Sequence, residues 1–381
     1  MSRVNADRIE ANLAPTASKT GPYCDARDRI PEAYLHELAA GAGAEMEAAT
    51  PEQWLWRGRH VKVVDGSSFT MADTVENQGE YPQVATQAPG AGFPIARFVA
   101  VMSLALGTVL DAAIAPYQGK LTGEHALLRQ LLHCLNVGDV VLGDAYYGSY
   151  FLIATLLAGG VDCVFQMNGC RDVDFRRGKR LGRRDHLVSW LKPKRPSWMT
   201  VEEYAQFPKT IEVRESEFIV DVVGCRSSNI IVVSTLLNEK KYTISDLSAL
   251  YRRRWVAEIN LRTLKTTMKM EYIRCQSPEM VRKDFWAHIL AYNLIRKLMA
   301  QAALGAGRQP WEISFKGAVQ NLAAFRNLWL FSNIDPAKVM RHLLNAISQQ
   351  IVGHRPNRHE PRAQKRRPKQ YPFLTVRRAL M

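Results

Sequence analysis

VKVVDGSSF (residues 61–69) is an apolar run that leads into Asp65 and a Gly-Ser-Ser segment, a pattern that predicts a buried strand followed by a turn. VGDVVLGDAYYGS (residues 137–149) repeats the pattern, because its apolar run also ends at an aspartate, Asp144. Strand-like and helix-like patterns alternate around these two stretches. We expect strands at 98–106, 109–117 and 161–167, and helices at 123–135 and from 151 onward.

This succession of three strands, a helix, a strand, a helix and a strand predicts an α/β fold, in which helices cover both faces of a mixed sheet. Open α/β sheets place functional groups at strand ends, so Asp65 and Asp144 are candidate site residues. An aspartate at a strand end is also a common turn former, and this alternative holds for each of the two taken singly.

The remaining segments differ in composition and predict further units. Residues 168–242 are first basic and then strand-rich, which predicts a β-rich insertion. Thr243 and Asp246 have the spacing of a capping box, which would start a helix that runs to residue 270. The expected organisation is a partial helical N-terminal region (1–60), a first core part (61–167), the insertion (168–242), a core part with the long helix (243–300), C-terminal helices (301–354) and a basic tail (355–381).

The chain of 381 residues carries 51 Lys and Arg against 36 Asp and Glu, a net charge of +15 that favours a polyanionic partner. Residues 251–300 hold eleven Lys and Arg against four acids, and residues 355–381 hold nine against one. Residues 171–195 form a third basic segment, with ten against three. Such islands are typical of a nucleic-acid footprint, although solvated faces or a disordered tail give similar charge runs.

Several classes of protein are disfavoured. The 47% of hydrophobic residues argues against disorder of the whole chain, and the most apolar stretch, 98–110, is shorter than the ~20 residues that a membrane helix needs. The start MSRVNADRIEANL lacks a secretion signal, and six cysteines without a CxxC pair predict reduced thiols, so a cytoplasmic location is expected. No Walker or GxGxxG pattern occurs, so ATP is not expected. The histidines form no HxxxH pair, and His125 and His133 are expected to be structural.

The predicted helix 246–270 carries a basic stripe beside an apolar one. At about 100° per residue, one arc of about 80° holds a single carboxylate, Glu258, among polar and basic side chains. Pairing with Arg254 and Arg262 would explain this glutamate on an exposed helix. Alternatively, Glu258 joins Asp65 and Asp144 in a magnesium-dependent phosphoryl-transfer site, because hard oxygen ligands hold two ions about 4 Å apart. The stripe consists of Tyr251, Arg254, Glu258, Arg262, Lys265 and Lys269.

The spacing Tyr251-x2-Arg254-x3-Glu258-x6-Lys265 resembles the Tyr-Arg-Glu-Lys signature of the DDE transposases of bacterial insertion sequences, in the group called insertion-sequence family four. VVDGSS around Asp65 is similar to the first acidic motif of that family, and LGDAYYGS around Asp144 to its second. The second motif departs from the usual Asp-Arg-Gly-aromatic pattern. Arg252, Trp255 and Arg262, which flank or lie within the signature, are also similar to that family. Two segments resemble flanking parts of related transposases: PYCDARDRIP (22–31) and EPRAQKRRPKQYPFL (360–374).

The resemblance implies a ribonuclease-H-like core with a β-rich insertion before the catalytic helix, and cut-and-paste DNA transposition through a hairpin intermediate and strand transfer. It implies that Asp65, Asp144 and Glu258 hold two Mg²⁺ ions, with Mn²⁺ as a substitute. The partners would be double-stranded DNA, meaning terminal inverted repeats and target, and a second copy of the chain in a synaptic complex. Relatives tend to carry more chain before the first acidic motif, so a shortened start is expected.

The resemblance also implies roles for neighbouring residues. Tyr251, Arg254, Arg262 and Lys265 would contact phosphates near the cut. Hairpin formation strains the duplex end, so a base is expected to flip and stack on an aromatic ring. Trp190 or Trp198 in the basic insertion is the candidate, with Trp198 preferred, although either could be a packing residue. Two alternatives to a transposase stay open: a nuclease of the same fold that cuts without joining, and a non-catalytic DNA-binding remnant.

Overall fold

The computed structural model describes residues 2–16, 19–220, 228–331 and 333–353. The predicted basic tail, together with the 360–374 segment, lies outside the described residues. The strands are β1 (Val61–Met71), β2 (Ile95–Ser103), β3 (Val109–Pro116), β4 (Val140–Gly143), β5 (Asp162–Gln166), β6 (Lys179–Gly182), β7 (Asp185–Leu191), β8 (Thr210–Val220), β9 (Ser228–Ser234) and β10 (Tyr272–Ile273).

Helices precede, interrupt and follow these strands. The α-helices are α1 (Ser2–Glu10), α2 (Gly21–Asp28), α3 (Glu32–Ala48), α4 (Val75–Glu80), α5 (Glu124–Gln130), α6 (Tyr150–Ala158), α7 (Val201–Gln206), α8 (Ile244–Arg252), α9 (Trp255–Arg262), α10 (Pro278–Gly305), α11 (Phe315–Phe331) and α12 (Pro336–Ser348). Shorter turns are η1 (Glu52–Trp54), η2 (Leu132–Cys134), the π-type η3 (Thr263–Thr267) and η4 (Pro310–Glu312). Among the described residues, no helix combines the length and hydropathy that crossing a bilayer requires.

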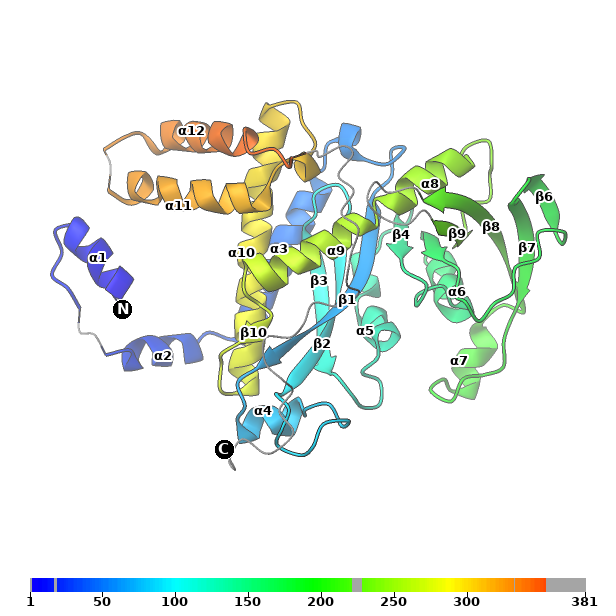
Figure 1. Cartoon of the computed structure of the whole chain (residues 1–381), viewed down its shortest axis with the longest axis horizontal. Helices are drawn as coiled ribbons and strands as arrows, with labels where there is room; N and C mark the ends of the chain where they lie inside the picture. The colour runs from blue at the N-terminus through cyan, green and yellow to red at the C-terminus, as the bar shows by residue number, and fades with distance from the viewer. Residues whose placement is uncertain (1, 17–18, 221–227, 332, 354–381) are drawn as a thin grey trace, which may run out of the picture.

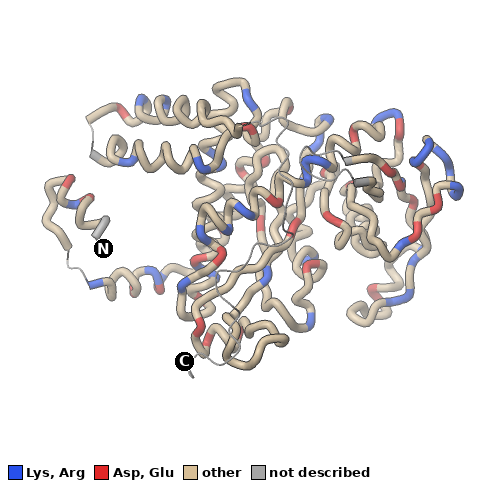
Figure 2. The backbone as a smooth tube through the Cα atoms, viewed as in Figure 1, with Lys and Arg blue, Asp and Glu red and all other residues tan. Residues whose placement is uncertain are grey.

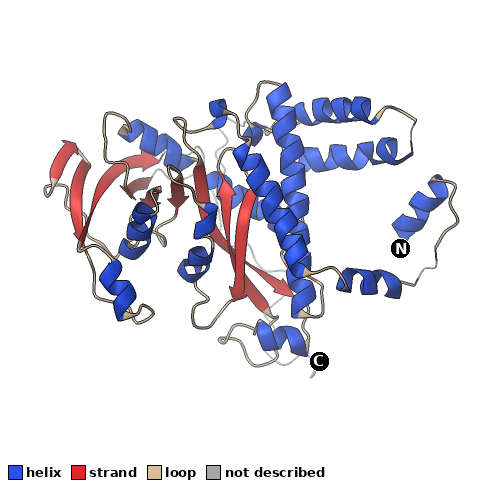
Figure 3. Ribbon diagram, turned by 180° about the vertical axis from the view of Figure 1, so that it is seen from behind, coloured by secondary structure: helices blue, strands red, loops and turns tan. Residues whose placement is uncertain are grey.

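One sheet runs through the molecule in the order β3-β2-β1-β4-β5-β9-β8-β7-β6, and β10 pairs with the far end of β1. The pairs β1 with β4, β4 with β5 and β1 with β10 are parallel, and the other pairs are antiparallel. The sheet is therefore mixed, as the sequence predicts. The hairpins α11–α12 and β6–β7 lie at opposite ends of the long axis (Figures 1 and 3).

Both faces of the sheet are covered, because side chains along the central strands alternate between two apolar cores. Val63 and Phe69 of β1 belong to the core that α3, α9 and α10 close. Val64 belongs to the second core, with residues of α5 and α6. The prediction of a mixed sheet between two helix layers is confirmed.

The segment 168–242 is rich in strands, and these strands continue the core sheet. β9 pairs with β5 in antiparallel register, from Val164 opposite Ser234 to Gln166 opposite Val232. β8, β7 and β6 then follow in turn. Figure 2 shows Lys and Arg gathered at the outer end of the β6–β7 hairpin.

Two predicted helices are shorter than expected. The capping box of Thr243 and Asp246 starts α8, but the chain forms i→i−3 hydrogen bonds at Arg253 and Arg254 before α9 begins, and α9 ends in a π-turn. Lys269 has φ +62° and lies beyond this turn, so it is not part of the helix. The predicted helix 123–135 is α5 followed by the 3-10 turn η2.

A buried ion pair holds the outer strands to the chain that leads into α8. The Arg214 guanidinium donates to both oxygens of Asp185, at 2.8 and 2.6 Å, and to the carbonyl of Tyr242 at 2.6 Å. Ser216 Oγ donates to the same carboxylate at 2.7 Å. Both partners are almost fully buried, so neither charge can be hydrated if the other is removed.

We expect Arg214→Ala to lower the free energy of unfolding by about 3–5 kcal/mol, because it leaves the Asp185 carboxylate buried without its counter-ion. Arg176→Ala is the matched control, since Arg176 pairs with Asp174 on the exposed surface of the same insertion. Urea denaturation of the two variants tests this. Equal stabilities for both variants would contradict the argument.

Candidate active site

Asp65 lies inside β1 and not at its end, which corrects the predicted turn. Gly66, Ser67 and Ser68 continue the strand because each pairs with β2, opposite Val99, Phe98 and Arg97. This pairing outweighs the turn preference of the Gly-Ser-Ser segment. On its other edge β1 pairs with β4 only over residues 61–63 and with β10 only at residues 70–71, so in the described chain no strand covers residues 64–69 there.

Asp144 follows the last residue of β4 and lies beside this open edge. Its Oδ1 accepts a hydrogen bond from the Tyr146 backbone N–H at 2.8 Å, which fixes the turn between β4 and α6. β4 pairs in parallel with β1, Val63 opposite Leu142, so Asp144 follows the end of β4 at the level of Asp65 within β1. The sequence prediction of a strand that ends at Asp144 is confirmed.

Glu258 approaches the open edge from α9, which packs against β1. Arg254 Nη2 donates to Glu258 Oε1 at 2.7 Å, so the i,i+4 pairing expected for an exposed helix is present. Asp65 and Glu258 line one open cleft of about 360 Å³. Its other lining residues are Gly66, Ser67, Leu261, Arg262, Lys265, Thr266 and Glu271.

The pKa of Asp65 depends on the charges of the other two carboxylates. Burial raises the pKa of Asp65 to about 6. The Gly66 N–H and Arg254 oppose this rise in pKa, whereas the charges of Asp144 and Glu258 add to it. Asp65 therefore lies close enough to both other acids to feel their charge, and Arg254 is the main cation that compensates the group.

Tyr251 is buried next to the acids, near the end of α8 and seven residues before Glu258. Its hydroxyl donates to Gln166 Oε1 at 3.2 Å, which links α8 to the end of β5. Burial raises the pKa of Tyr251 to about 12, Arg254 lowers it, and Asp144 and Glu258 raise it further. Arg262 is exposed and Lys265 half-buried at the cleft.

Glu124 is an acid near the cleft that the sequence reasoning missed. It lies in the first turn of α5, where an acidic residue is ordinary, so the sequence gives no signal for it. A Cβ on Gly66 would stand 2.6 Å from the Glu124 carboxyl carbon, so the glycine makes room for it. Glu124 Oε2 accepts from the Tyr147 hydroxyl at 3.1 Å, and burial raises the pKa of Glu124.

The donor set of the cleft fits a divalent cation of the magnesium type. Three carboxylates offer only hard oxygen atoms, which Mg²⁺ prefers. In the described part of the chain, only one group of His, Cys, Asp or Glu residues has three donor atoms within 4.8 Å of one another, and it lies elsewhere. The oxygen atoms of the three acids here are therefore spaced more widely. Two ions about 4 Å apart would suit a wider spacing better than one ion.

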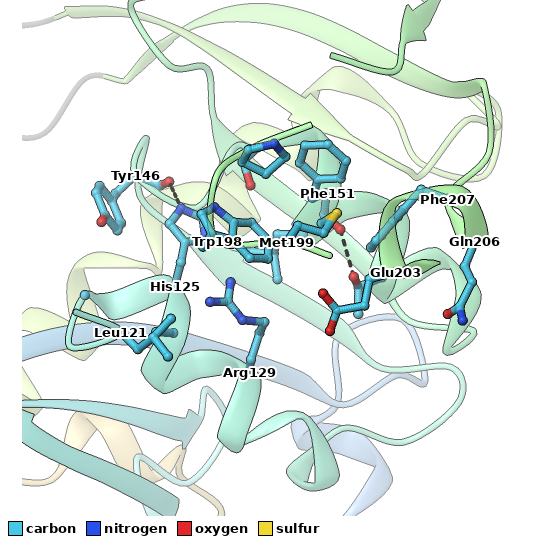
Figure 4. Close-up of a pocket in the computed structure, with 16 residues that line it drawn as sticks. Leu121, His125, Arg129, Tyr146, Phe151, Trp198, Met199, Glu203, Gln206 and Phe207 are labelled. Atoms are coloured by element: carbon cyan, nitrogen blue, oxygen red, sulfur yellow. Dashed lines mark hydrogen bonds between the residues drawn. The ribbon is translucent and has the colours of Figure 1, made fainter. Parts of the chain in front are cut away.

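The two candidate tryptophans lie in different surroundings. Trp190 is buried, its indole N–H donates to Glu215 Oε1 at 2.7 Å and Arg171 covers its ring at 3.7 Å, so the structure contradicts a stacking role for it. Trp198 is 46% exposed and lines a pocket of about 600 Å³ (Figure 4). The Arg129 guanidinium lies 4.3 Å from its ring centroid.

The same pocket borders the turn after Asp144. Tyr146 lines it and is 49% exposed. His125 Nε2 donates to the Tyr146 carbonyl at 2.7 Å, and the two rings lie 4.7 Å apart (Figure 4). His125 thus positions this turn, in agreement with the structural role that the sequence predicts for it.

Comparison with known proteins matches this chain to one family. Residues 56–294 match the model of the transposase DDE domain, and this range contains every cleft residue named above. The transposase InsG for insertion sequence element IS4 of Escherichia coli (strain K12) is 24% identical over 369 residues, which cover 94% of this chain and 78% of that protein.

Among solved structures, the piggyBac transposase synaptic complex with hairpin DNA aligns at 10% identity with a TM-score of 0.42. The alignment covers 82% of this chain, and the chain spans 65% of the length of that structure. The family assignment rests on the sequence match, which extends over more than half of the chain. With Asp65 and Glu258 in one cleft and Asp144 beside them, all inside the matched range, this chain belongs to the DDE transposase family of insertion sequences, whose members are polynucleotidyl transferases.

Proposed function

We propose that this protein catalyses cut-and-paste transposition of an insertion sequence, by cleaving DNA at the terminal inverted repeats, closing a hairpin and transferring strands into target DNA. The observation that carries the proposal is the convergence of Asp65, Asp144 and Glu258 at the open edge of β1. Turn formation by an aspartate, or ion pairing of a glutamate on an exposed helix, would not explain why the three acids lie close together.

A ribonuclease-H-like core is part of the proposal. The order β3-β2-β1-β4-β5, with β1, β4 and β5 parallel and β2 antiparallel to both of its neighbours, supports it. The segment between β5 and β9 would then be the insertion, and α8 with α9 the catalytic helix. The boundaries proposed for these parts are 61–167, 168–242 and 243–300, with helices to 354.

Asp65, Asp144 and Glu258 would hold two Mg²⁺ ions, for which Mn²⁺ can substitute. Such ions activate the attacking oxygen and neutralise the leaving one. The first reaction would be hydrolysis at the transposon end. The freed 3′-hydroxyl would attack the opposite strand to close the hairpin, a second hydrolysis would open it, and the 3′-hydroxyl would then join target DNA.

The cations of the cleft would position the DNA backbone. Arg262 and Lys265 line the cleft beside Glu258 and make no ion pair within the described residues, so their charges are available to phosphates. Arg254 forms an ion pair with Glu258, and its guanidinium would contact a phosphate as well as this carboxylate. Tyr251 would support Arg254, whose guanidinium lies 5.8 Å from its ring centroid.

The pocket of Trp198 would receive a flipped base, which relieves strain at the hairpin end. An exposed indole next to an arginine offers a stacking surface, and base–aromatic stacking contributes about 1–3 kcal/mol per base. The pocket reaches Tyr146, two residues after Asp144, so a base bound there would lie beside the acids. Double-stranded DNA is the proposed partner, bound by two copies of the chain in a synaptic complex.

Glu258→Gln should reduce cleavage of an inverted-repeat duplex in Mg²⁺ by about 10³-fold or more, because it removes an ion ligand worth several kcal/mol of charge stabilisation. DNA binding should persist. Glu271→Gln is the matched control, since Glu271 lines the same cleft without an assigned role. Product analysis of labelled duplexes measures both effects.

The products also separate the alternatives. Hairpins and joined strands that disappear in Glu258→Gln support a transposase, whereas nicks without joining indicate a nuclease of the same fold. Binding without any cleavage in Mg²⁺ or Mn²⁺ indicates a non-catalytic remnant. Activity that Glu258→Gln leaves unchanged would overturn the site assignment.

Arg254→Ala and Lys265→Ala should each weaken DNA binding and flatten the dependence of log K on log salt by roughly one unit of slope, because each removes one phosphate contact. Lys297→Ala serves as the control, since Lys297 pairs with Glu45 on another surface. Binding isotherms at several salt concentrations measure the slopes. Unchanged slopes in both variants would exclude phosphate contacts at these residues.

Trp198→Ala should slow hairpin formation by about 5- to 150-fold, the equivalent of the 1–3 kcal/mol of one stacked base, and Trp198→Phe should retain most of the rate. A fluorescent adenine analogue at the duplex end reports stacking directly. Trp311→Ala is the control, because Trp311 is similarly exposed, at 49%, on η4. A normal rate and normal stacking in Trp198→Ala would contradict the proposed role.

A further inference from the structure

A second group of metal-ligating side chains lies at the edge strand β3. Asp111 belongs to β3, and His133 and Cys134 belong to the 3-10 turn η2 that follows α5. One donor atom of each lies within 4.8 Å of the others. This group shares no residue with the cleft of Asp65.

The distances within the group match the edges of a tetrahedral metal site. His133 Nε2 lies 3.0 Å from Asp111 Oδ2 and 3.6 Å from Cys134 Sγ. Ligands at zinc bond lengths of about 2.0–2.3 Å in tetrahedral geometry stand about 3.3 Å apart for nitrogen and oxygen, and about 3.6 Å apart for nitrogen and sulfur. The side chains therefore need little movement to share one cation.

The hydrogen bonds of a neutral His133 place the lone pair of Nε2 between the Asp111 carboxylate and the Cys134 sulfur. Its Nδ1 lies 2.9 Å from the Gln130 carbonyl, and its Nε2 faces the Asp111 carboxylate. Both partners accept hydrogen bonds, whereas a neutral imidazole carries one N–H only. With Nδ1–H donating to the carbonyl, Nε2 keeps its lone pair for a cation, and such a bond from the outer ring nitrogen is usual for a metal-bound histidine.

Asp111 is held in place from its other side. Its Oδ1 accepts from the Ala112 N–H at 2.7 Å and faces His36 Nε2 at 2.8 Å, while the His36 ring stacks on Trp286 at 4.1 Å. Asp111 is buried, so its orientation is fixed and Oδ2 is the oxygen left for a cation. Such outer contacts commonly fix the ligands of metal sites.

Cys134 completes a donor set that suits zinc. Its sulfur lies 3.6 Å from His133 Nε2, and zinc binds cysteine as the thiolate, so binding would release the thiol proton. Lys62 already pairs with Asp139 and donates to the Cys134 carbonyl, both at 2.6 Å. A cavity of about 430 Å³ reaches the group and would admit the ion and a solvent ligand.

We propose that Asp111, His133 and Cys134 bind one Zn²⁺ ion, with solvent as the fourth ligand. The mixed nitrogen, sulfur and oxygen set is one that zinc accepts and magnesium does not. The ion would tie η2 to the edge strand β3. This site shares no residue with the cleft of the proposed cleavage chemistry.

The full-length protein is equilibrated with Zn²⁺, dialysed free of excess metal and analysed for bound zinc. Wild type should retain one zinc ion per chain, and His133→Ala and Cys134→Ser should lose it. Cys170→Ser and His342→Ala are the controls, since both residues are exposed and lie in other elements. Glu258→Gln should retain zinc, because it alters only the other site.

Cobalt replacement gives a readout that needs no variant. Co²⁺ bound to the Cys134 thiolate should show a sulfur-to-metal charge-transfer absorption in the wild type, which the all-oxygen cleft cannot produce. Absence of this absorption in the wild type would overturn the proposal. Equal zinc content in wild type, His133→Ala and Cys134→Ser would also overturn it.

Discussion

The one-sided pairing of β1 is the constraint on which the acidic cleft depends. β2 holds residues 62–70 of this strand along one edge, whereas β4 leaves the other edge after residue 63 and β10 joins it only at residue 70. A longer β4 would draw Asp144 into the ladder and close the space in front of Asp65. Because β4 ends at Gly143, the chain turns away from β1 at Asp144, beside Asp65. The gap that is left has room for Glu258 of α9.

Gathering three carboxylates at this gap is unfavourable unless positive charge accompanies them. The pKa of Asp65 rises to about 6 from burial, and the neighbouring acids add to the rise. Arg254 compensates part of the negative charge through its bond to Glu258. Arg254 forms an ion pair with only one of the three carboxylates, so a divalent cation would stabilise the group further.

The sequence predicts the main elements of the fold and that acids lie at its strand ends and on the helix before residue 270, and its errors have local causes. The strand and helix order and the end of β4 at Asp144 follow from apolar runs and their lengths. The continuation of β1 through Gly66 does not, because pairing with β2 overrides turn preference. The break of the long helix at Arg253 could not be predicted, because the sequence has no glycine or proline there. Glu124 is brought to Gly66 only by the packing of α5 on the sheet.

The zinc group illustrates the same limit, because its members have no metal-binding spacing in the sequence and meet only through the sheet. Val101 of β2 pairs with Val64 on one side and Asp111 on the other, so these three side chains share a face. Asp65, the next residue of β1, points to the opposite face. Two groups of different donor chemistry therefore lie on opposite faces of one sheet without sharing residues: carboxylate oxygens alone on the α9 face, and a thiol, an imidazole and one carboxylate on the α5 face.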